Sequence, residues 1–223
     1  MTTINYVILA AGKGTRMRSA KPKVLHRLAG RSMLQHVVTT VDALGESKKI
    51  IVTGHGAPLV EEQFDDVNTL FVQQKEQLGT AHAVQMALPA LCDDAVVVVL
   101  YGDVPLIRPA TIKRLLQVVG DKSIGLLTIT LDDPQGYGRI VRNSTGAITS
   151  IVEQKDASSE QLTINEVNTG VLALSAKQLR QWLPKIDNNN AQGEYYLTDL
   201  IALAVQADVA VLSVNPETAA EVE

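Results

Sequence analysis

Two glycines followed by cations form the first stretch that could do chemistry. Gly12 and Gly14 come directly after an apolar run near the N-terminus, and Arg16 and Lys23 follow them. Glycines let a backbone approach a ligand closely, a guanidinium can bridge two phosphate oxygens, and an ammonium acts as a compact point charge. This combination suits a triphosphate whose α-phosphorus is attacked while pyrophosphate leaves, because stabilisation of negative charge provides most of the catalysis in such reactions.

The spacing differs from two better-known phosphate-binding motifs. In the dinucleotide fingerprint G-x-G-x-x-G the third glycine position is occupied here by Met17, and no acidic residue lies about 20 residues further on to bind a ribose. In a P-loop the lysine follows a four-residue spacer, whereas Lys13 lies between the glycines. The pattern argues against a nicotinamide enzyme and a Walker-type ATPase. A basic surface loop without a ligand stays open as the alternative.

The charges are distributed unevenly along the chain. Residues 1–41 carry seven basic and no acidic side chains, while the remainder carries 13 basic and 24 acidic ones. A short region of positive potential suits a small polyanion and argues against a general nucleic-acid binder. The N-terminus has no leader-like pattern and no apolar stretch nears the roughly 18 residues of a membrane span, so we expect a cytoplasmic protein without a membrane partner.

Four further residues could contact a nucleotide or a metal. Asp103 follows an apolar strand in Y-G-D and is a candidate ligand for Mg²⁺, although a lone aspartate there could also be a turn or cap residue. Gln74 ends a predicted strand, and its amide can both donate to and accept from a base edge, although it could equally be an exposed strand end. Gly79 and Thr80 open a predicted helix, whose first N–H groups are free to bind a ligand.

The elements expected to position these residues alternate between strands and helices. Apolar runs predict strands near 4–10, 49–54, 69–74, 95–101 and 124–131, and helical periodicity lies between them. Ser32 is the expected N-cap of the first helix, Gly45 its end, and Pro109 begins a later helix. Strands that are apolar on both faces predict a Rossmann-like α/β fold, with a parallel sheet covered by helices on both sides.

After residue 131 the pattern changes. A turn-rich stretch precedes a predicted hairpin over 139–153 and a strand over 166–174; helices near 176–183 and 197–207 and a strand over 209–214 follow. We expect one unit over 1–223, with a nucleotide-binding core (1–131), a small β-rich lobe (132–207) and a return strand with the C-terminal segment (208–223). A cleft should lie between core and lobe.

Ordered motifs along the chain resemble those of nucleotide-sugar pyrophosphorylases. They are L-A-A-G-K-G-T-R-M with K-P-K-V-L-H, Q-L-G-T-A-H-A, L-Y-G-D-V-P-L-I, G-Y-G-R-I, I-V-E-Q-K-D-A, N-T-G and N-N-N-A-Q-G-E-Y-Y-L-T-D. From residue 4 to the C-terminus the sequence closely resembles the bacterial N-acetylglucosamine-1-phosphate uridylyltransferases. The resemblance implies the nucleotide-diphospho-sugar transferase fold, with a mostly parallel mixed sheet and a small β-rich sugar-binding lobe.

The resemblance also implies an activity. It is the Mg²⁺-dependent transfer of a uridylyl group from UTP to N-acetylglucosamine 1-phosphate, which gives UDP-N-acetylglucosamine and pyrophosphate and feeds peptidoglycan and lipopolysaccharide synthesis. Another sugar-phosphate or non-sugar nucleotidyltransferase stays open as an alternative, as does a catalytically silent UDP-sugar sensor.

Residue roles follow from the same resemblance. Arg16, Lys23 and Asp103 are the expected catalytic residues, with Asp103 as the metal ligand. The expected nucleotide-binding residues are Leu9, Ala10, Ala11, Gly12, Gly14, Lys23, Gln74, Gly79, Thr80, Tyr101, Gly102 and Asp103. The expected sugar-binding residues are Gly138, Glu153, Asn168, Glu194, Tyr196 and Thr198. Without the resemblance this last group would be hairpin and cap residues, and Thr198 in particular could cap the helix that follows it.

In the resembled family, a left-handed β-helix that acetylates glucosamine 1-phosphate and trimerises follows this region. Its hexapeptide repeat is not found in the sequence, so we expect neither acetyltransferase activity nor that mode of trimerisation. The family's second metal ligand is an asparagine a few residues beyond the final E-V-E, and weak metal affinity is therefore expected. The single tryptophan, Trp182, is expected in the core, and Cys92 has no paired base that would indicate covalent catalysis.

Overall fold

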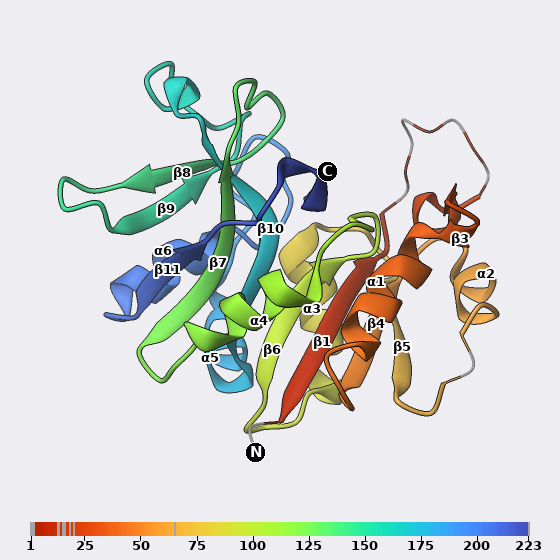
Figure 1. The fold of residues 1–223 in the computed structure, drawn as a ribbon. Coiled ribbons are helices and arrows are strands. Elements are labelled where there is room, and N and C mark those ends of the chain that lie inside the picture. The colour runs from red at the N-terminus through yellow and green to blue at the C-terminus, as the bar shows by residue number, and fades with distance from the viewer. Residues whose placement is uncertain are drawn as a thin grey trace.

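A computed structural model describes residues 3–12, 14, 17, 19, 21–64 and 66–222. Within this part of the chain a central sheet has the strand order β11-β7-β10-β6-β1-β4-β5, and β8 and β9 extend from it beside β10 (Figure 1). Its strands are β1 (Ile4–Ala10), β4 (Lys48–Thr53), β5 (Thr69–Gln73), β6 (Val96–Tyr101), β7 (Ser123–Thr130), β8 (Arg139–Arg142), β9 (Ile148–Val152), β10 (Glu166–Ser175) and β11 (Ala210–Val214). The short strands β2 (Arg27–Leu28) and β3 (Arg31–Ser32) form a separate ribbon.

The helices lie between these strands. They are α1 (Met33–Asp42), α2 (Ala57–Glu61), α3 (Thr80–Ala87), α4 (Pro109–Gln117), α5 (Ala176–Trp182) and α6 (Asp199–Gln206). Single 3₁₀ turns occur at η2 (Lys23–Leu25), η3 (Leu88–Ala90), η4 (Gln161–Thr163), η5 (Leu183–Lys185) and η6 (Ala219–Glu221). Among the described residues, none of the helices has the length and apolar character needed to cross a membrane.

Along the order β11-β7-β10-β6-β1-β4-β5 the strands are parallel except for β10, and the branch of β8 and β9 pairs antiparallel. β1 pairs in parallel with β4 and β6, β4 with β5, and β7 with β11, whereas β10 runs antiparallel between β6 and β7. The expected mostly parallel mixed sheet is therefore confirmed. The sheet is also continuous across residue 131, because β10 belongs to the expected lobe in sequence and to the middle of the sheet in space.

Local signals explain the first helix. Ser32 Oγ accepts a hydrogen bond from Gln35 N at 3.2 Å, and Gln35 Oε1 accepts one from Ser32 N at 2.9 Å, which completes a capping box. The buried residues of α1 recur at helical spacing, and Gly45, with φ of +109°, follows its end. The predicted start and end of this helix are confirmed.

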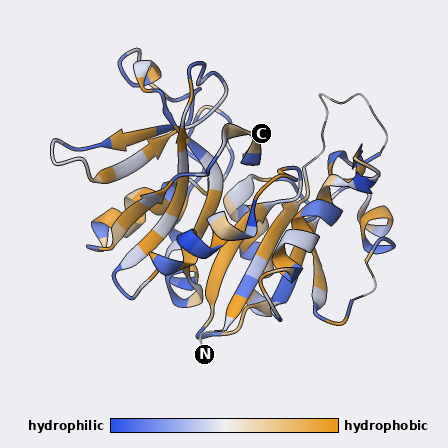
Figure 2. Ribbon diagram, in the orientation of Figure 1, coloured by the Kyte–Doolittle hydropathy of each residue, from blue (hydrophilic) through white to orange (hydrophobic). Residues whose placement is uncertain are grey.

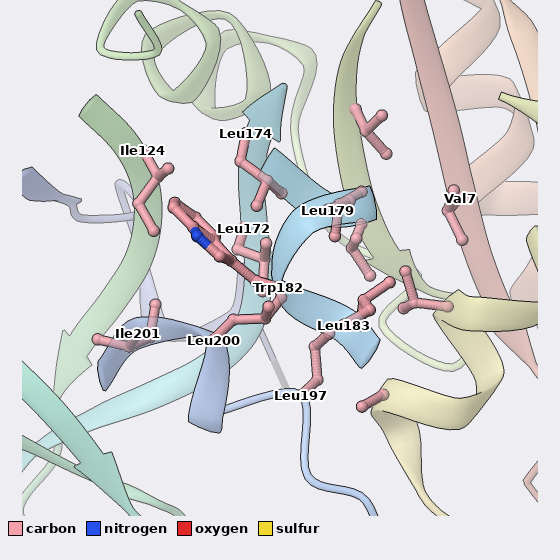
Figure 3. Close-up of a cluster of buried hydrophobic side chains, with 14 of the residues drawn as sticks. Val7, Ile124, Leu172, Leu174, Leu179, Trp182, Leu183, Leu197, Leu200 and Ile201 are labelled. Atoms are coloured by element: carbon pink, nitrogen blue, oxygen red, sulfur yellow. The ribbon is translucent and has the colours of Figure 1, made fainter. Parts of the chain in front are cut away.

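Apolar side chains cover both faces of the sheet. The central strands are accordingly hydrophobic along much of their length (Figure 2). Alternate residues of β1 enter two different cores: Val7 and Leu9 pack with α3, α5 and α6, while Tyr6, Ile8 and Ala10 pack with α1, α2 and α4. Trp182 is 2% exposed and lies among apolar side chains of β7, β10 and α6, so its predicted core position is confirmed (Figure 3). Two covered faces leave the sheet edge at the carboxyl ends of the parallel strands as the place for a ligand.

Candidate active site

A cavity of about 640 Å³ opens at the carboxyl ends of β1 and β6. It extends to the residue after β5 and to the first turn of α3. The lining residues are Leu9, Ala10, Ala11, Gly12, Gly14, Met17, Lys23, Val24, Gln74, Gln77, Gly79, Thr80, Ala83, Tyr101, Asp103 and Glu194. A volume of this size lies within the range of small-molecule sites, and its position is the usual one for ligands of parallel sheets.

Most residues expected to bind a nucleotide line this cavity. Gly102 does not: its N–H donates to Leu9 O at 2.9 Å, and a Cβ there would lie 3.3 Å from the same oxygen. Gly102 therefore lies beneath the lining residues, and its hydrogen bond to Leu9 joins the end of β6 to the end of β1. Arg16, an expected catalytic residue, lies outside the described residues.

Four lining residues were missed by the sequence analysis: Met17, Val24, Gln77 and Ala83. Ala83 stands one helical turn after Gly79, so helical spacing could have indicated that it faces the same side. Gln77 Nε2 donates to Gln74 O at 3.0 Å, a turn contact that no local pattern predicted. Three of these four residues, Met17, Val24 and Ala83, add apolar surface to the cavity wall, as is usual in small-molecule sites.

Lys23 and Asp103 meet at the cavity although 80 residues separate them. Lys23 begins η2, which the buried side chains of Val24 and Leu25 fix to the core, and Asp103 follows the end of β6. The Lys23 Nζ atom lies 2.8 Å from Asp103 Oδ2, and the two side chains are 41% and 28% exposed. An ammonium and a carboxylate thus face the same open space, where both can exchange partners when an anion or a metal ion arrives.

The loop glycine Gly14 shapes the entrance. Its φ is +56°, a conformation that glycine adopts readily, and a Cβ at this position would lie 2.9 Å from the Cβ of Lys23. The backbone at Gly14 therefore lies against the Lys23 side chain. Any larger residue at Gly14 would push the lysine away from Asp103.

Gln74 lies in the cavity wall and is only 3% exposed. Its backbone N–H donates to Thr53 O at 2.8 Å, and its amide nitrogen Nε2 donates to Gly79 O at 3.0 Å. The same nitrogen lies 3.0 Å from His82 Nδ1. We expected the amide both to donate and to accept, but both of its N–H bonds already have partners, and the carbonyl oxygen Oε1 is the group left for a ligand.

The start of α3 is fixed by a neighbouring segment. Tyr195 N donates to Leu78 O at 2.8 Å, Ala81 N donates to Tyr195 O at 2.9 Å, and Leu197 N donates to the Thr80 hydroxyl at 3.0 Å. This pairing connects the nucleotide-binding set to the segment that carries Glu194, Tyr196 and Thr198.

Four of the expected sugar-binding residues are neighbours. Thr198 Oγ1 donates to Glu153 Oε1 at 3.1 Å, a Cβ on Gly138 would lie 3.4 Å from both Glu153 carboxylate oxygens, and Asn168 N donates to Gly138 O at 2.9 Å. Burial raises the pKa of Glu153, and Asp156 raises it further, while the hydrogen bond from Thr198 acts in the opposite direction. Thr198 makes no side-chain cap to α6, so the alternative role of helix cap is not found.

The other two belong to the same region. Glu194 lines the cavity, and the buried Tyr196 hydroxyl has no hydrogen-bond partner among the residues that the structure describes. Tyr101 lies between the two sets: burial raises the pKa of its hydroxyl, and the carboxylates of Glu153 and then Asp103 add to the effect. Of the six expected sugar-binding residues, only Glu194 lines the cavity, while Glu153 lies near enough to Tyr101 to influence its hydroxyl.

Known proteins with similar sequences share this whole region. The chain is 53% identical over 220 residues to a protein named "Bifunctional protein GlmU" from Cellvibrio japonicus, and the match covers 99% of this chain and 49% of the relative. A protein of the same name from Pseudomonas putida is 56% identical over 223 residues, covering 99% and 48%. The chain thus spans about half the length of these relatives.

Solved structures show the same fold at low identity. A UDP-glucose pyrophosphorylase complexed with UDP-glucose aligns with a TM-score of 0.77 at 18% identity, covering 96% of this chain and 90% of that one. A putative glucose-1-phosphate thymidylyltransferase from Bacillus anthracis aligns with a TM-score of 0.75 at 20% identity, covering 96% and 87%. Both belong to the fold of nucleotide-diphospho-sugar transferases, which confirms the expected fold class.

The family model described as the MobA-like NTP transferase domain matches residues 6–161. This range contains β1, Lys23, Gln74 and Asp103, and so includes most of the cavity described above. Because this match covers more than half of the chain, the chain belongs to the family of MobA-like NTP transferase domains.

Proposed function

We propose that this chain transfers a uridylyl group from UTP to N-acetylglucosamine 1-phosphate, giving UDP-N-acetylglucosamine and pyrophosphate. The observation that carries the proposal is the pair of Lys23 and Asp103, 2.8 Å apart at a cavity built from the ends of β1 and β6. The choice of UTP and of this sugar phosphate rests on the similarity to the GlmU proteins and on the ordered sequence motifs. The product would supply peptidoglycan and lipopolysaccharide synthesis.

The transfer needs no covalent enzyme intermediate. An oxygen of the sugar phosphate attacks the α-phosphorus of UTP in line, a new P–O bond forms, and the bond to pyrophosphate breaks. We assign Lys23 to the developing charge on the phosphoryl oxygens and Arg16 to the phosphates that leave. The Gly12 and Gly14 backbone allows the triphosphate to come close to both.

The residues present fit a Mg²⁺ ion held largely by substrate. Among the described residues there is no cluster of three or more His, Cys, Asp or Glu side chains that could form a metal site of protein ligands alone. Mg²⁺ in nucleotide sites commonly takes one or two carboxylates together with phosphate oxygens and waters, and Asp103 offers one such carboxylate at the cavity. When bound, the ion would supply positive charge to the triphosphate.

The two substrates occupy the two ends of the site. We assign the nucleotide to residues within the proposed core of residues 1–131: Leu9, Ala10, Ala11, Gly12, Gly14, Lys23, Gln74, Gly79, Thr80, Tyr101, Gly102 and Asp103. We assign the sugar to Gly138, Glu153, Asn168, Glu194, Tyr196 and Thr198, within the proposed lobe of residues 132–207. Glu153 suits hydroxyl groups because its carboxylate is largely buried and already accepts from a hydroxyl, that of Thr198.

Pyrophosphate release over a grid of substrates tests the proposal. UTP, CTP, dTTP and ATP are each combined with N-acetylglucosamine 1-phosphate, glucose 1-phosphate and a non-sugar phosphate in the presence of Mg²⁺. UTP with N-acetylglucosamine 1-phosphate is expected to react fastest, and the Asp103→Asn variant is the matched control that should be inactive. Faster release with another pair would replace the substrates. Binding of UDP-N-acetylglucosamine without release under any divalent metal would indicate a sensor.

A further inference from the structure

The orientation of one buried amide determines what the cavity offers to a base. Gln74 is 3% exposed and lines the cavity, and its Nε2 atom lies 3.0 Å from Gly79 O. A backbone carbonyl oxygen can only accept a hydrogen bond, so the amide nitrogen must face it. The opposite orientation would place two oxygen acceptors against each other at this distance.

His82 provides the second contact to the same nitrogen. Its Nδ1 atom lies 3.0 Å from Gln74 Nε2, which has two N–H donors and no acceptor. Nδ1 must therefore accept, and the proton of the neutral ring is on Nε2. His82 is partly exposed and does not belong to the residues that line the cavity, so it can influence a ligand there only through Gln74.

We propose that His82 is a positioning residue for base selection: with Gly79 O it holds the Gln74 amide so that the cavity presents an acceptor, Oε1, to the nucleobase. The inference rests on the proposed function, because it assumes that a nucleoside triphosphate is bound here. His82 was not among the site residues predicted from the sequence. The inference also changes the role of Gln74, whose side chain would only accept from the base and would not donate to it.

Base chemistry then defines the class of nucleotide. Uracil and thymine carry a hydrogen on N3 and can donate to Oε1, whereas N3 of cytosine is an acceptor and would face another acceptor. An amide that is free to turn over could present its N–H group to cytosine instead. The two contacts to Nε2 prevent this, because turning the amide would break both and bring Oε1 against Gly79 O.

The expected effect of removing His82 is moderate, because Gly79 O still holds one N–H of the amide. A neutral hydrogen bond contributes enough to change an equilibrium roughly two- to tenfold. In His82→Leu we therefore expect the preference for uridine over cytidine nucleotides to fall roughly two- to tenfold.

The test measures equilibrium binding of UTP and CTP by calorimetry, and kcat/KM for both nucleotides. His82→Asn is the rescue variant, since its side-chain oxygen is attached to Cγ as Nδ1 is and can accept from Gln74. Gln85→Leu is the matched control, because Gln85 is an exposed residue of the same helix. The inference expects a lower UTP-to-CTP ratio in the leucine variant only, with restoration in the asparagine variant and a normal melting temperature in all three.

An unchanged ratio in His82→Leu, with UTP binding intact, would overturn the inference while leaving the proposed function in place. Failure of the wild-type chain to bind any uridine nucleotide would instead overturn the proposed function. In that case the ¹⁵N spectrum of the His82 ring still decides the orientation. A proton on Nδ1 in the neutral ring would refute it, and an unprotonated Nδ1 that changes in Gln74→Leu would support it.

Discussion

Replacement of Lys23 by alanine should separate a catalytic role from a structural one. The Lys23 and Asp103 side chains are 41% and 28% exposed, so their ion pair is partly screened by water. Pairs of this kind contribute about 0.2–1 kcal/mol to stability. For a domain of this size about 1 kcal/mol corresponds to roughly 2–4 °C in melting temperature. The fold should therefore tolerate the loss of Lys23.

The turnover of the enzyme, in contrast, should fall strongly in Lys23→Ala. A preorganised group that stabilises charge only in the transition state contributes about 2.7–4 kcal/mol, or roughly 10²–10³ in turnover. We therefore expect Lys23→Ala to lower the turnover of UTP by this factor with a melting temperature within about 4 °C of the wild type. Continuous detection of pyrophosphate at saturating substrate measures the first quantity, and a thermal melt measures the second.

Lys21 is the matched control for this experiment. It lies in the same cationic stretch, is exposed, and does not line the cavity. Lys21→Ala should retain turnover within about twofold if position rather than general positive potential matters. The reasoning fails if Lys23→Ala also stays within twofold, or if both variants lose activity to the same extent.

Three further substitutions test other parts of the molecule. In Gly79→Ala a Cβ would lie 2.4 Å from Tyr195 O at φ of +118°, so urea denaturation should show a loss of about 2 kcal/mol or more. Burial, with nearby carboxylates, raises the pKa of Asp199 to about 6. The folded chain thus keeps a proton that the unfolded chain releases near pH 4, so the free energy of unfolding decreases as the pH rises from about 4 to about 6. Asp199→Asn removes this loss and should raise the melting temperature at about pH 7 but not at about pH 4. Glu221 is 1% exposed and accepts from Thr111 Oγ1 at 2.6 Å, so Glu221→Ala should lower the free energy of unfolding by about 2–4 kcal/mol.

Each of these predictions has its own control or contrary result. Gly136 has φ of +90°, and among the described residues no atom lies within 4 Å of where its Cβ would be, so Gly136→Ala should cost only about 1 kcal/mol. A melting temperature of Asp199→Asn that follows the wild type at every pH would show that Asp199 ionises normally. Glu217 forms exposed ion pairs with Arg108 and Arg114, and Glu217→Ala should cost no more than about 1 kcal/mol. An equal loss for Glu217 and Glu221 would contradict the importance of burial.

The sequence predicted those features that depend on neighbouring residues. The cap at Ser32, the glycine stop at Gly45 and the apolar strand over 4–10 are local signals, and each matches the structure. The sequence also predicts that most of the expected nucleotide-binding residues lie around one cavity. They come at the ends of parallel strands or at the start of a helix, and such positions meet at the same edge of the sheet.

The features that sequence reasoning missed depend on distant contacts. Both N–H bonds of Gln74 are occupied because α3 brings Gly79 and His82 against it, and a strand-end glutamine carries no sign of this. The hydrogen bond from Thr198 to Glu153 joins residues 45 positions apart, which is why a helix-cap role looked equally plausible. Such pairs are determined by how elements pack and not by local propensity.

The reversed direction of β10 explains why the two expected halves of the site meet. β10 pairs antiparallel with β6 in the register Leu172 to Val99 and Ser175 to Val96, so its beginning lies at the edge where β6 ends. In its pairing with β7, the register of β10 shifts between Asn168 and Leu172. Within this stretch Gly170, with φ of +86°, passes so near Tyr101 that a Cβ would lie 2.5 Å from the ring.

A parallel strand in the same place would bring its other end, near Ser175, to this edge and carry Asn168 to the far side of the sheet. One antiparallel strand inserted between parallel ones therefore brings Gly170, from the later part of the chain, against Tyr101 in the cavity wall. For the same reason, the change of sequence pattern near residue 131 does not mark a break in the sheet. Replacing Gly170 by alanine would strain this contact, because φ at this position is +86° and the added Cβ would meet the half-buried ring of Tyr101.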